Sequence, residues 1–404
     1  MKVLFVHQNF PGQFPHLAAE LAQRGHEITV ITRANNGRPI PYPTYRYRYD
    51  EPDLNVLGSN YAKMAMRGGR VAGLADRMRE EKGYVPDVIV GHCGWGETLF
   101  LKEVWPEATL LVYSEFFYRT RGLDVGFDPE FADERLEKRV RSVANQAHLA
   151  HALINADVIL SPTKWQASTH PQPFRDQINV IHDGVDTDLV CPNPKALVKL
   201  GEDGPEFRAG DEVLTFVSRK LEPYRGYHSF MRALPKVLKA RPNAQVVIVG
   251  EDGRGYGPIR VNTGGWKDEF FAPLKDTPLA KRIHFTDRVS YADYLSILQV
   301  ARVHCYLTYP FVLSWSMLEA MSAGVHLVAS ATPPVEEVIT DGMNGTLVDF
   351  FDTDQIADAL IEGLANPQAF DSLRQTAIKT AQDQYDLRGQ CLPKLVQLLE
   401  GLAT

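Results

Sequence analysis

A chain of 404 residues, 44% of them hydrophobic and 23% charged, has the composition of a soluble globular protein and is long enough for two domains with separate cores. Its net charge of -7 gives no support for wrapping a nucleic-acid backbone, so we expect no nucleic-acid partner. The opening MKVLFVHQNF meets polar residues too early for a signal-peptide core, and no apolar run of about 18 residues is present, so no membrane-spanning helix is expected.

The cysteines do not indicate a metal site or a disulfide framework. They are far apart in the sequence and form no C-x-x-C pair, so we expect a metal-free protein in a reducing cytoplasm. The four are Cys93, Cys191, Cys305 and Cys391.

The first half of the chain alternates apolar runs with helical patterns. Its start has an apolar run, the loop FPGQF, an amphipathic pattern through Leu17, Leu21 and Ala22, and a second apolar run, which together predict a βαβ unit. Further strand-like runs are PDVIVGH, TLLVYSE and DVILSP, and the charged segment 133–157 has a helical pattern. This alternation predicts a doubly wound parallel sheet over residues 1–190.

Residues 191–211 are rich in Pro, Gly and charge, which predicts a linker between domains. A second α/β series follows in 212–385, where the strand-like runs are VLTFVSRK, AQVVIVGED, RIHFTD, HCYLTYP and HLVAS. The tail 386–404 is an amphipathic helix interrupted by Pro393, and we expect it to pack back on the body. The fold class is therefore α/β, with two Rossmann-like domains facing a cleft that the loops after the strands should line.

Two arginines and one helix start predict an anion site in the second half. Arg219 and Arg225 lie between a strand and a helix, where two guanidinium groups can converge on an oxyanion; the alternative is a pair of surface arginines, one bound to Glu222. In the segment 309–330, Ser314 is placed to cap a helix that Gly324 would end, and a helix N-terminus favours an anion.

The loops of the first half carry the other candidate residues. His92 ends a strand and is followed by glycines, which let a ligand approach, while a hydrogen-bonded structural histidine is the alternative. Gly12 precedes a helix and permits close approach to a phosphate or sugar, although a turn requirement also explains it. Aromatic and charged residues after the next strand suit an acceptor sugar or anionic group, although most such loops are solvated connections. These are Glu115, Tyr118, Arg119 and Arg121.

The segment 61–84 holds six basic side chains against three acidic ones. Its Gly pair weakens a continuous helix, so we favour a solvated helix pair. Peripheral contact with an anionic bilayer or a lipid-linked acceptor is the alternative.

Several motifs in this order resemble the family 4 retaining glycosyltransferases, which have two Rossmann-like domains (GT-B type) and use nucleotide-sugar donors. They are FPGQF, DVIVGH, INVIHDGVD, Arg219 with Arg225, RIHFTDRVSYADYLSIL, LEAMSAGVHLVAS and EVITDGMNGTLVD. The resemblance covers nearly the whole chain.

The resemblance implies roles for particular residues. Arg219 and Arg225 would bind the donor diphosphate, although one extra residue separates them here. Glu319 matches the second glutamate of a Glu-x7-Glu motif, which holds the ribose, whereas Phe311 stands where relatives present a carboxylate to the donor sugar. His92 would reach the donor sugar. Further donor contacts are expected from Gly12, Arg288, Val289, Phe311 and the main chain of Val312, Leu313 and Ser314.

A departing diphosphate needs its growing negative charge neutralised more than it needs a protonating acid, so loss of the carboxylate at position 311 does not exclude transfer. We therefore predict a cytoplasmic, metal-independent retaining glycosyltransferase with no cofactor beyond its nucleotide-sugar substrate and with a glycan, a lipid-linked sugar or a small molecule as acceptor. The alternatives are an epimerase or phosphorylase on the same scaffold, or a sugar-nucleotide-binding protein without catalysis, which Phe311 favours. The sequence leaves the base, the sugar and the oligomeric state open.

Overall fold

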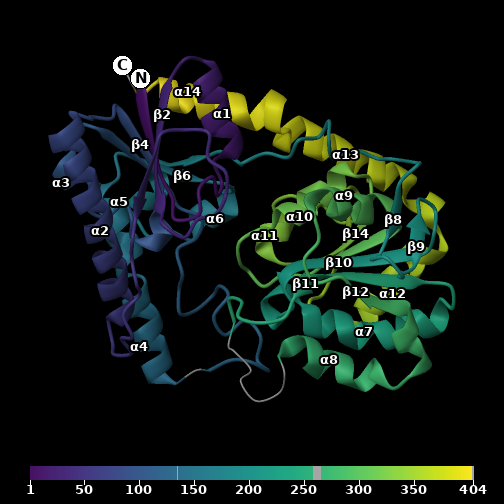
Figure 1. The fold of residues 1–404 in the computed structure, drawn as a ribbon. Helices are drawn as coiled ribbons and strands as arrows, with labels where there is room; N and C mark the ends of the chain where they lie inside the picture. Colours follow the sequence, from purple (N-terminus) through teal and green to yellow (C-terminus); the bar gives the residue numbers. More distant parts are fainter. Residues whose placement is uncertain (134, 258–264, 403–404) are drawn as a thin grey trace. The chain divides into compact units, whose positions relative to one another are not determined.

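The computed structural model describes residues 1–133, 135–257 and 265–402, which form two compact units (Figure 1). Unit 1 comprises Met1–Gly184 and Arg388–Thr404, and unit 2 comprises Val185–Leu387. Each unit is built on its own parallel sheet, which confirms the predicted α/β class. The boundary lies six residues before the expected position 190, and the end of the chain returns to unit 1.

Unit 1 contains a seven-stranded parallel sheet in the order β3-β2-β1-β4-β5-β6-β7. Its central strands read as continuous apolar runs because helices cover both faces of the sheet. Leu4 and Val6 point into one core and Val3 and Phe5 into the other, as the two-residue period of a strand requires. The strands are β1 Lys2–Val6, β2 Glu27–Arg33, β3 Thr44–Tyr47, β4 Val88–His92, β5 Thr109–Tyr113, β6 Val158–Ser161 and β7 Ile178–Val180.

The helices of unit 1 include one from the end of the chain. Leu395, Val396 and Leu399 of α14 join the core on the α1 side of the sheet, and α14 starts with Pro393 in its first turn, after the π-helical turn η6 (Leu387–Cys391). The others are α1 Pro15–Gln23, α2 Ser59–Lys82, η1 Cys93–Trp95, α3 Leu101–Val104, α4 Leu136–Asn145, α5 Ala147–Asn155, α6 Lys164–Ser168, η2 Phe174–Gln177 and α14 Leu392–Glu400.

The segment expected as a broken helix pair is one continuous helix, α2, of 24 residues. Packing explains the first glycine of its pair: a Cβ on Gly68 would lie 2.5 Å from the carbonyl oxygen of Gly96, whereas a Cβ on Gly69 would meet nothing within 4 Å. Gly96 has φ +83° and is itself closed in by the main chain of Met64. The helix therefore keeps glycine at position 68 because the loop after β4 approaches it closely, and this contact offsets the low helix propensity of glycine.

Unit 2 contains a six-stranded parallel sheet in the order β12-β11-β10-β13-β14-β15. Its strands are β10 Val213–Lys220, β11 Gln245–Glu251, β12 Ile283–Phe285, β13 Val303–Tyr306, β14 His326–Ser330 and β15 Thr346–Val348. Its helices are η3 Pro223–Arg225, α7 Tyr227–Ala240, α8 Trp266–Lys275, η4 Pro278–Arg282, α9 Tyr291–Val300, α10 Trp315–Ser322, α11 Pro333–Glu336, α12 Thr353–Ala365, η5 Pro367–Phe370 and α13 Asp371–Tyr385.

Residues 191–211 are not a free linker but a folded part of unit 2. They contain an antiparallel hairpin of β8 (Leu197–Lys199) and β9 (Glu206–Arg208). Val198 and Phe207 are buried in a core with Val213 and Val247 of the large sheet. The polar composition of the segment concealed these few alternating apolar residues, each of which is stabilised by burial against the sheet.

Across the described ranges, no helix has the length and apolar character needed to cross a bilayer.

Candidate active site

A cavity of about 260 Å³ lies where β10 and β11 end and α9 begins in unit 2. This is the edge of a parallel sheet at which ligands of such folds bind. Three of the predicted donor residues, Arg219, Arg288 and Val289, line it. The other lining residues are Val217, Ser218, Val249, Gly250, Glu251, Asp287, Tyr291 and Tyr294.

The wall of this cavity contains a strained residue. Asp287 has φ +48° and is the only non-glycine residue with positive φ in the ranges that the structure covers. Its carbonyl accepts a hydrogen bond from Gly250 N (3.1 Å), and its carboxylate accepts one from Lys267 Nζ (2.9 Å). A Cβ on Gly250 would lie 2.3 Å from Ser218 O, so only glycine fits there. Such strain persists where the surroundings hold the main chain, which is typical of ligand sites.

Arg219 presents an uncompensated positive charge at this cavity. Its side chain is exposed, and within the described part of the chain no carboxylate lies within ion-pair distance of its guanidinium. Its Cζ lies 5.2 Å from the centre of the Tyr256 ring. Glu222, the suggested partner, is buried and accepts hydrogen bonds from the main-chain N–H groups of Tyr256 and Gly257 (3.0 and 2.9 Å). Glu222, the carboxylate suggested as an example of an arginine partner, is therefore not that partner.

Arg225 is bound rather than free. Its Nη1 donates to Thr308 Oγ1 (3.0 Å) and to the carbonyl of Val312 (2.8 Å), so the side chain holds the loop before α10. Its Cζ lies 5.8 Å from the Tyr256 ring centre, so both arginines contact one aromatic ring. Arg219 lines the cavity and Arg225 supports the loop beside it.

The start of α10 has the predicted capping geometry. Ser314 is the N-cap, its Oγ accepts from Ser316 N (3.4 Å), and its own N–H donates to the Tyr306 hydroxyl (2.8 Å). Gly324, with φ +74°, follows the helix. Leu313 is buried, while the N–H of Val312 has no hydrogen bond to any described residue. Val312 lies two residues before the N-cap, so this N–H belongs to the loop that leads into α10 and is open to a ligand there.

Phe311 does not line the cavity, because its side chain is fully buried. Its ring centre lies 4.6 Å from that of Tyr256 and 5.5 Å from that of Tyr224. The guanidinium of Arg225 lies 5.5 Å from the same ring. Phe311 thus packs against Tyr256 and Arg225 instead of lining the cavity as a donor contact.

Glu319 lies behind two tyrosines of the cavity wall. Tyr291 and Tyr294 donate their hydroxyls to its two carboxylate oxygens (2.8 and 2.6 Å). Burial raises the pKa of Glu319, and the two tyrosine hydrogen bonds oppose this rise. The tyrosines were missed from the sequence, although their i, i+3 spacing at the start of α9 places both hydroxyls on one face.

In unit 1, two of the predicted residues, His92 and Glu115, meet where β4 and β5 end, together with Gln13, which was not predicted. His92 Nε2 lies 3.4 Å from Glu115 Oε2, and Gln13 Nε2 donates to Glu115 Oε1 (3.1 Å). His92 Nδ1 accepts from Gly94 N (2.9 Å), so a neutral His92 carries its proton on Nε2, toward Glu115. Burial would raise the pKa of Glu115, but His92 and Gln13 outweigh it and the pKa is lowered.

Gly12 packs against a histidine that the sequence analysis missed. Its φ is +55°, and a Cβ there would lie 2.6 Å from the His7 ring, so the position requires glycine. Burial, followed by the charge of His92, lowers the pKa of His7 to about 3, so His7 is neutral. The His7 and His92 ring centres are 6.0 Å apart. The position of His7 directly after β1 was the available signal.

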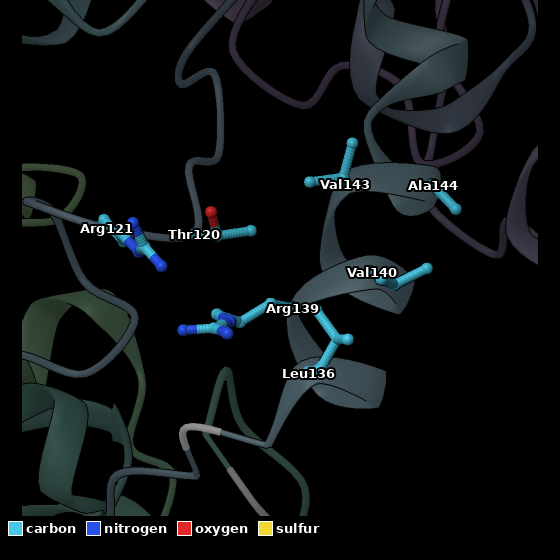
Figure 2. Close-up of a pocket in the computed structure, with 7 residues that line it drawn as sticks. All are labelled: Thr120, Arg121, Leu136, Arg139, Val140, Val143 and Ala144. Carbon is cyan, nitrogen blue, oxygen red and sulfur yellow. The ribbon is translucent and has the colours of Figure 1, made fainter.

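The other predicted acceptor residues, Tyr118, Arg119 and Arg121, make their contacts outside the cluster of His92, Glu115 and Gln13. Arg119 donates to the carbonyls of Thr169 and His170 (2.8 and 3.2 Å), which follow α6, so its role is structural. Tyr118 packs edge-on against Phe116 with ring centres 5.1 Å apart. Arg121 lines a separate hollow beside α4 (Figure 2).

A second buried polar cluster surrounds Arg67 of α2. Arg67 Nη1 donates to Gln8 Oε1 (3.1 Å), and Glu97 accepts a hydrogen bond from the Tyr47 hydroxyl (2.5 Å). Burial raises the pKa of Glu97 to about 7, against the Tyr47 hydrogen bond and the charge of Arg67. Arg67 Nε and Glu97 Oε2 are buried without a hydrogen-bond partner in the described structure. The sequence did not predict this cluster, because Arg67 is one of several basic residues in α2 and nothing in the sequence distinguishes it from the others.

Within the described ranges, no group of three or more His, Cys, Asp or Glu side chains is arranged to hold a metal ion.

Two family models match this chain, one in its first half and one in its second half. Residues 24–190 match the glycosyl transferase family 4 group, and residues 202–384 match the glycosyl transferases group 1. The chain is 28% identical over 371 residues to a D-inositol 3-phosphate glycosyltransferase of Mycobacterium avium, with 87% of this chain and 79% of that protein covered.

A second relative is matched over less of its length. This is the GDP-mannose-dependent alpha-(1-6)-phosphatidylinositol monomannoside mannosyltransferase of Mycolicibacterium smegmatis. The chain is 25% identical to it over 256 residues, which cover 61% of this chain and 63% of that protein. The match therefore spans less than two thirds of the relative.

Solved structures share the fold. Sucrose-phosphate synthase from Thermosynechococcus elongatus superposes with a TM-score of 0.73 at 17% identity, covering 100% of this chain and 99% of that one. The Anabaena protein HepE, solved in complex with UDP-glucose, has a TM-score of 0.67 at 15% identity, covering 99% of this chain and 100% of that one. The architecture is that of a GT-B glycosyltransferase. Within that class, the chain belongs to glycosyltransferase family 4.

Proposed function

We propose that this protein transfers a sugar from a nucleotide-diphosphate sugar to an acceptor hydroxyl with retention of the anomeric configuration. The observation that carries the proposal is the unpaired guanidinium of Arg219 on the wall of the unit 2 cavity. A guanidinium group that forms no ion pair with a carboxylate of the protein can bind an anionic ligand. Two similar proteins support this donor class, because the mannosyltransferase is GDP-mannose-dependent and HepE was solved in complex with UDP-glucose.

The donor would bind along the strand ends of unit 2. The cavity between β10, β11 and α9 would take the nucleoside, with Tyr291 and Tyr294 fixed by Glu319 at the ribose. Arg219 and the N–H of Val312 would contact the diphosphate. Arg225 would act by holding Val312 in place as well as by its charge.

The proposed chemistry needs no carboxylic acid at the sugar. The bond between the anomeric carbon and the diphosphate oxygen breaks, the acceptor oxygen bonds to the same face of that carbon, and the acceptor proton passes to the released diphosphate. Negative charge grows on the diphosphate during this step, and fixed positive groups stabilise it. Burial of Phe311 is compatible with this scheme because its ring packs against Arg225 and against Tyr256, the ring that Arg219 contacts.

Acceptor recognition would fall to unit 1. His92, Glu115 and Gln13 present a histidine N–H, a carboxylate and an amide where three strands end. Groups of this kind hydrogen-bond to sugar or polyol hydroxyls. The relatives' names include an inositol phosphate and a phosphatidylinositol mannoside, so we propose a hydroxyl-rich acceptor: a glycan, a lipid-linked sugar or a small polyol.

The test has two stages. A thermal-shift screen against UDP, GDP and ADP should find one nucleotide that raises the melting temperature, because a ligand that binds only the folded state stabilises it. The matching nucleotide sugar is then incubated with candidate acceptors, and the anomeric configuration of the product is read by NMR. If no nucleotide shifts the melting temperature, or if the product is inverted, the proposal fails.

A catalytically silent sugar-nucleotide-binding protein is the second candidate, because Phe311 replaces the carboxylate. It predicts saturable donor binding without nucleotide release for any acceptor. Slow hydrolysis of the donor in the absence of acceptor would count against it, because a silent binding protein releases no nucleotide.

A further inference from the structure

Helix α4 of unit 1 has an apolar face that no described residue buries. Leu136, Val140 and Val143 recur at helical spacing on this face, and the helix has no buried residue. Their exposed fractions are 67%, 42% and 57%. An amphipathic helix of a globular protein normally packs its apolar face on the core. An apolar face that stays exposed therefore indicates a surface that binds another molecule or a membrane.

Two arginines lie beside this face. A hollow of about 520 Å³ is lined by Leu136, Val140 and Val143 together with Arg121 and Arg139. Figure 2 shows the arginine side chains, one from the loop before α4 and one from α4 itself, extending toward one another. Neither arginine has an ion-pair partner in the part of the chain that the structure describes.

The apolar surface continues onto a neighbouring loop. Arg141 Nη1 of α4 donates to Asn55 Oδ1 (3.0 Å), which ties the loop before α2 to α4. In this loop Val56 and Leu57 are 67% and 60% exposed. Exposed apolar side chains thus come from two elements that are in contact, and we call them, with Arg121 and Arg139, the α4 surface.

We propose that the α4 surface docks on an anionic phospholipid bilayer. Its apolar side chains would enter the boundary between headgroups and acyl chains, and the two arginines would bind lipid phosphates. Lys138 and Arg141 add positive charge to the helix, whose one acidic residue is Glu137, so α4 is basic although the whole chain has a net charge of -7. A second copy of the chain is a poorer occupant, because a twofold contact would bring two copies of the same positively charged surface together. The proposal goes beyond the transfer reaction and does not depend on it.

The experiment is flotation of the full chain with vesicles of phosphatidylcholine alone or with added phosphatidylglycerol, without donor or acceptor. We expect binding to the anionic vesicles that weakens with salt. Leu136→Ser with Val143→Ser should abolish it, whereas Met343→Ser, at a residue of unit 2 that is 60% exposed, should not. Arg121→Ala and Arg139→Ala should each weaken it roughly fivefold, as expected for about 1 kcal/mol per arginine. Lys199→Ala, an exposed cation elsewhere, is the charge control.

Four outcomes would overturn the proposal. One is no binding to either vesicle type. Another is binding that the α4 variants leave unchanged while circular dichroism shows them folded. The third is loss of vesicle binding in the presence of inorganic phosphate at matched ionic strength, which would indicate an anion site without lipid. Light scattering distinguishes a self-association surface, since a wild-type dimer that the double variant dissociates would also refute docking. Each readout is independent of nucleotide binding, so failure here leaves the proposed transfer reaction standing.

Discussion

Removal of the Arg219 side chain is the most direct test of the donor site. The guanidinium is exposed and makes no ion pair with a described residue, so Arg219→Ala leaves no protein group without its partner. Its contact with the Tyr256 ring is an exposed cation–π interaction worth about 0.5–1 kcal/mol, which sets the expected loss of stability.

The expected loss of nucleotide binding is larger than this loss of stability. A hydrogen bond to a charged group contributes about 1.5–3 kcal/mol, so Arg219→Ala should raise the Kd of the nucleoside diphosphate roughly 10- to 150-fold. The corresponding nucleoside, which lacks the phosphates, should bind both proteins equally. Arg219→Lys should recover part of the loss, because an ammonium keeps the charge without the fork of donors.

Isothermal titration calorimetry of the diphosphate and of the nucleoside measures this difference directly. Arg208→Ala is the matched control, since Arg208 is exposed in unit 2 and paired with Glu206 outside the cavity. Arg225→Ala is an instructive contrast, because it also removes the donor to Thr308 and Val312 and should lower the melting temperature. A diphosphate Kd within twofold of wild type for Arg219→Ala would refute the assignment.

Three further predictions concern unit 1 and the metal question. Gly12→Ala should destabilise the protein by at least about 1–2 kcal/mol, because the left-handed backbone and the His7 ring both oppose a Cβ. Urea unfolding measures this loss of stability, and an unchanged unfolding midpoint would contradict the packing of Gly12 against His7. Because burial raises the pKa of Glu97 from 4.5 to about 7, the folded protein holds that proton more tightly, and stability should fall by up to about 3 kcal/mol as the pH rises through this range. Glu97→Gln should flatten that decline between pH 5 and 8, and a parallel decline in the variant would show that other groups cause it. Transfer activity should survive EDTA, and loss of activity restored by a divalent cation would refute metal independence.

The central strands of both sheets, and their order of appearance, could be predicted from the sequence because a strand buried on both faces is a continuous apolar run, which is a local property. The short strands β3, β7, β8, β9 and β15 were not predicted. The cap of α10 was equally local, since Ser314 bonds within its own turn and Gly324 ends the helix by its own conformation. Arg219 and His92 could be predicted as site residues because each lies at the carboxyl end of a parallel strand, where ligands of such folds bind.

Tertiary structure decided what each candidate side chain contacts. The sequence could not show that Glu222 binds the main chain of Tyr256 and Gly257, that Phe311 is buried beneath Tyr256, or that Arg225 holds Val312. Each of these contacts joins residues that are far apart in the chain, where periodicity and local propensity carry no information.

The same reason explains the errors at the glycine pair and at the linker. Gly68 is tolerated within α2 only because the main chain at Gly96 passes next to it, and residues 191–211 fold because Val198 and Phe207 find the sheet of unit 2. By itself, then, the sequence determined the elements, their class and the strand ends that carry polar side chains. The three-dimensional fold decided which of those side chains are buried, which are paired and which remain open to a ligand, because burial and pairing depend on neighbours that only folding brings together.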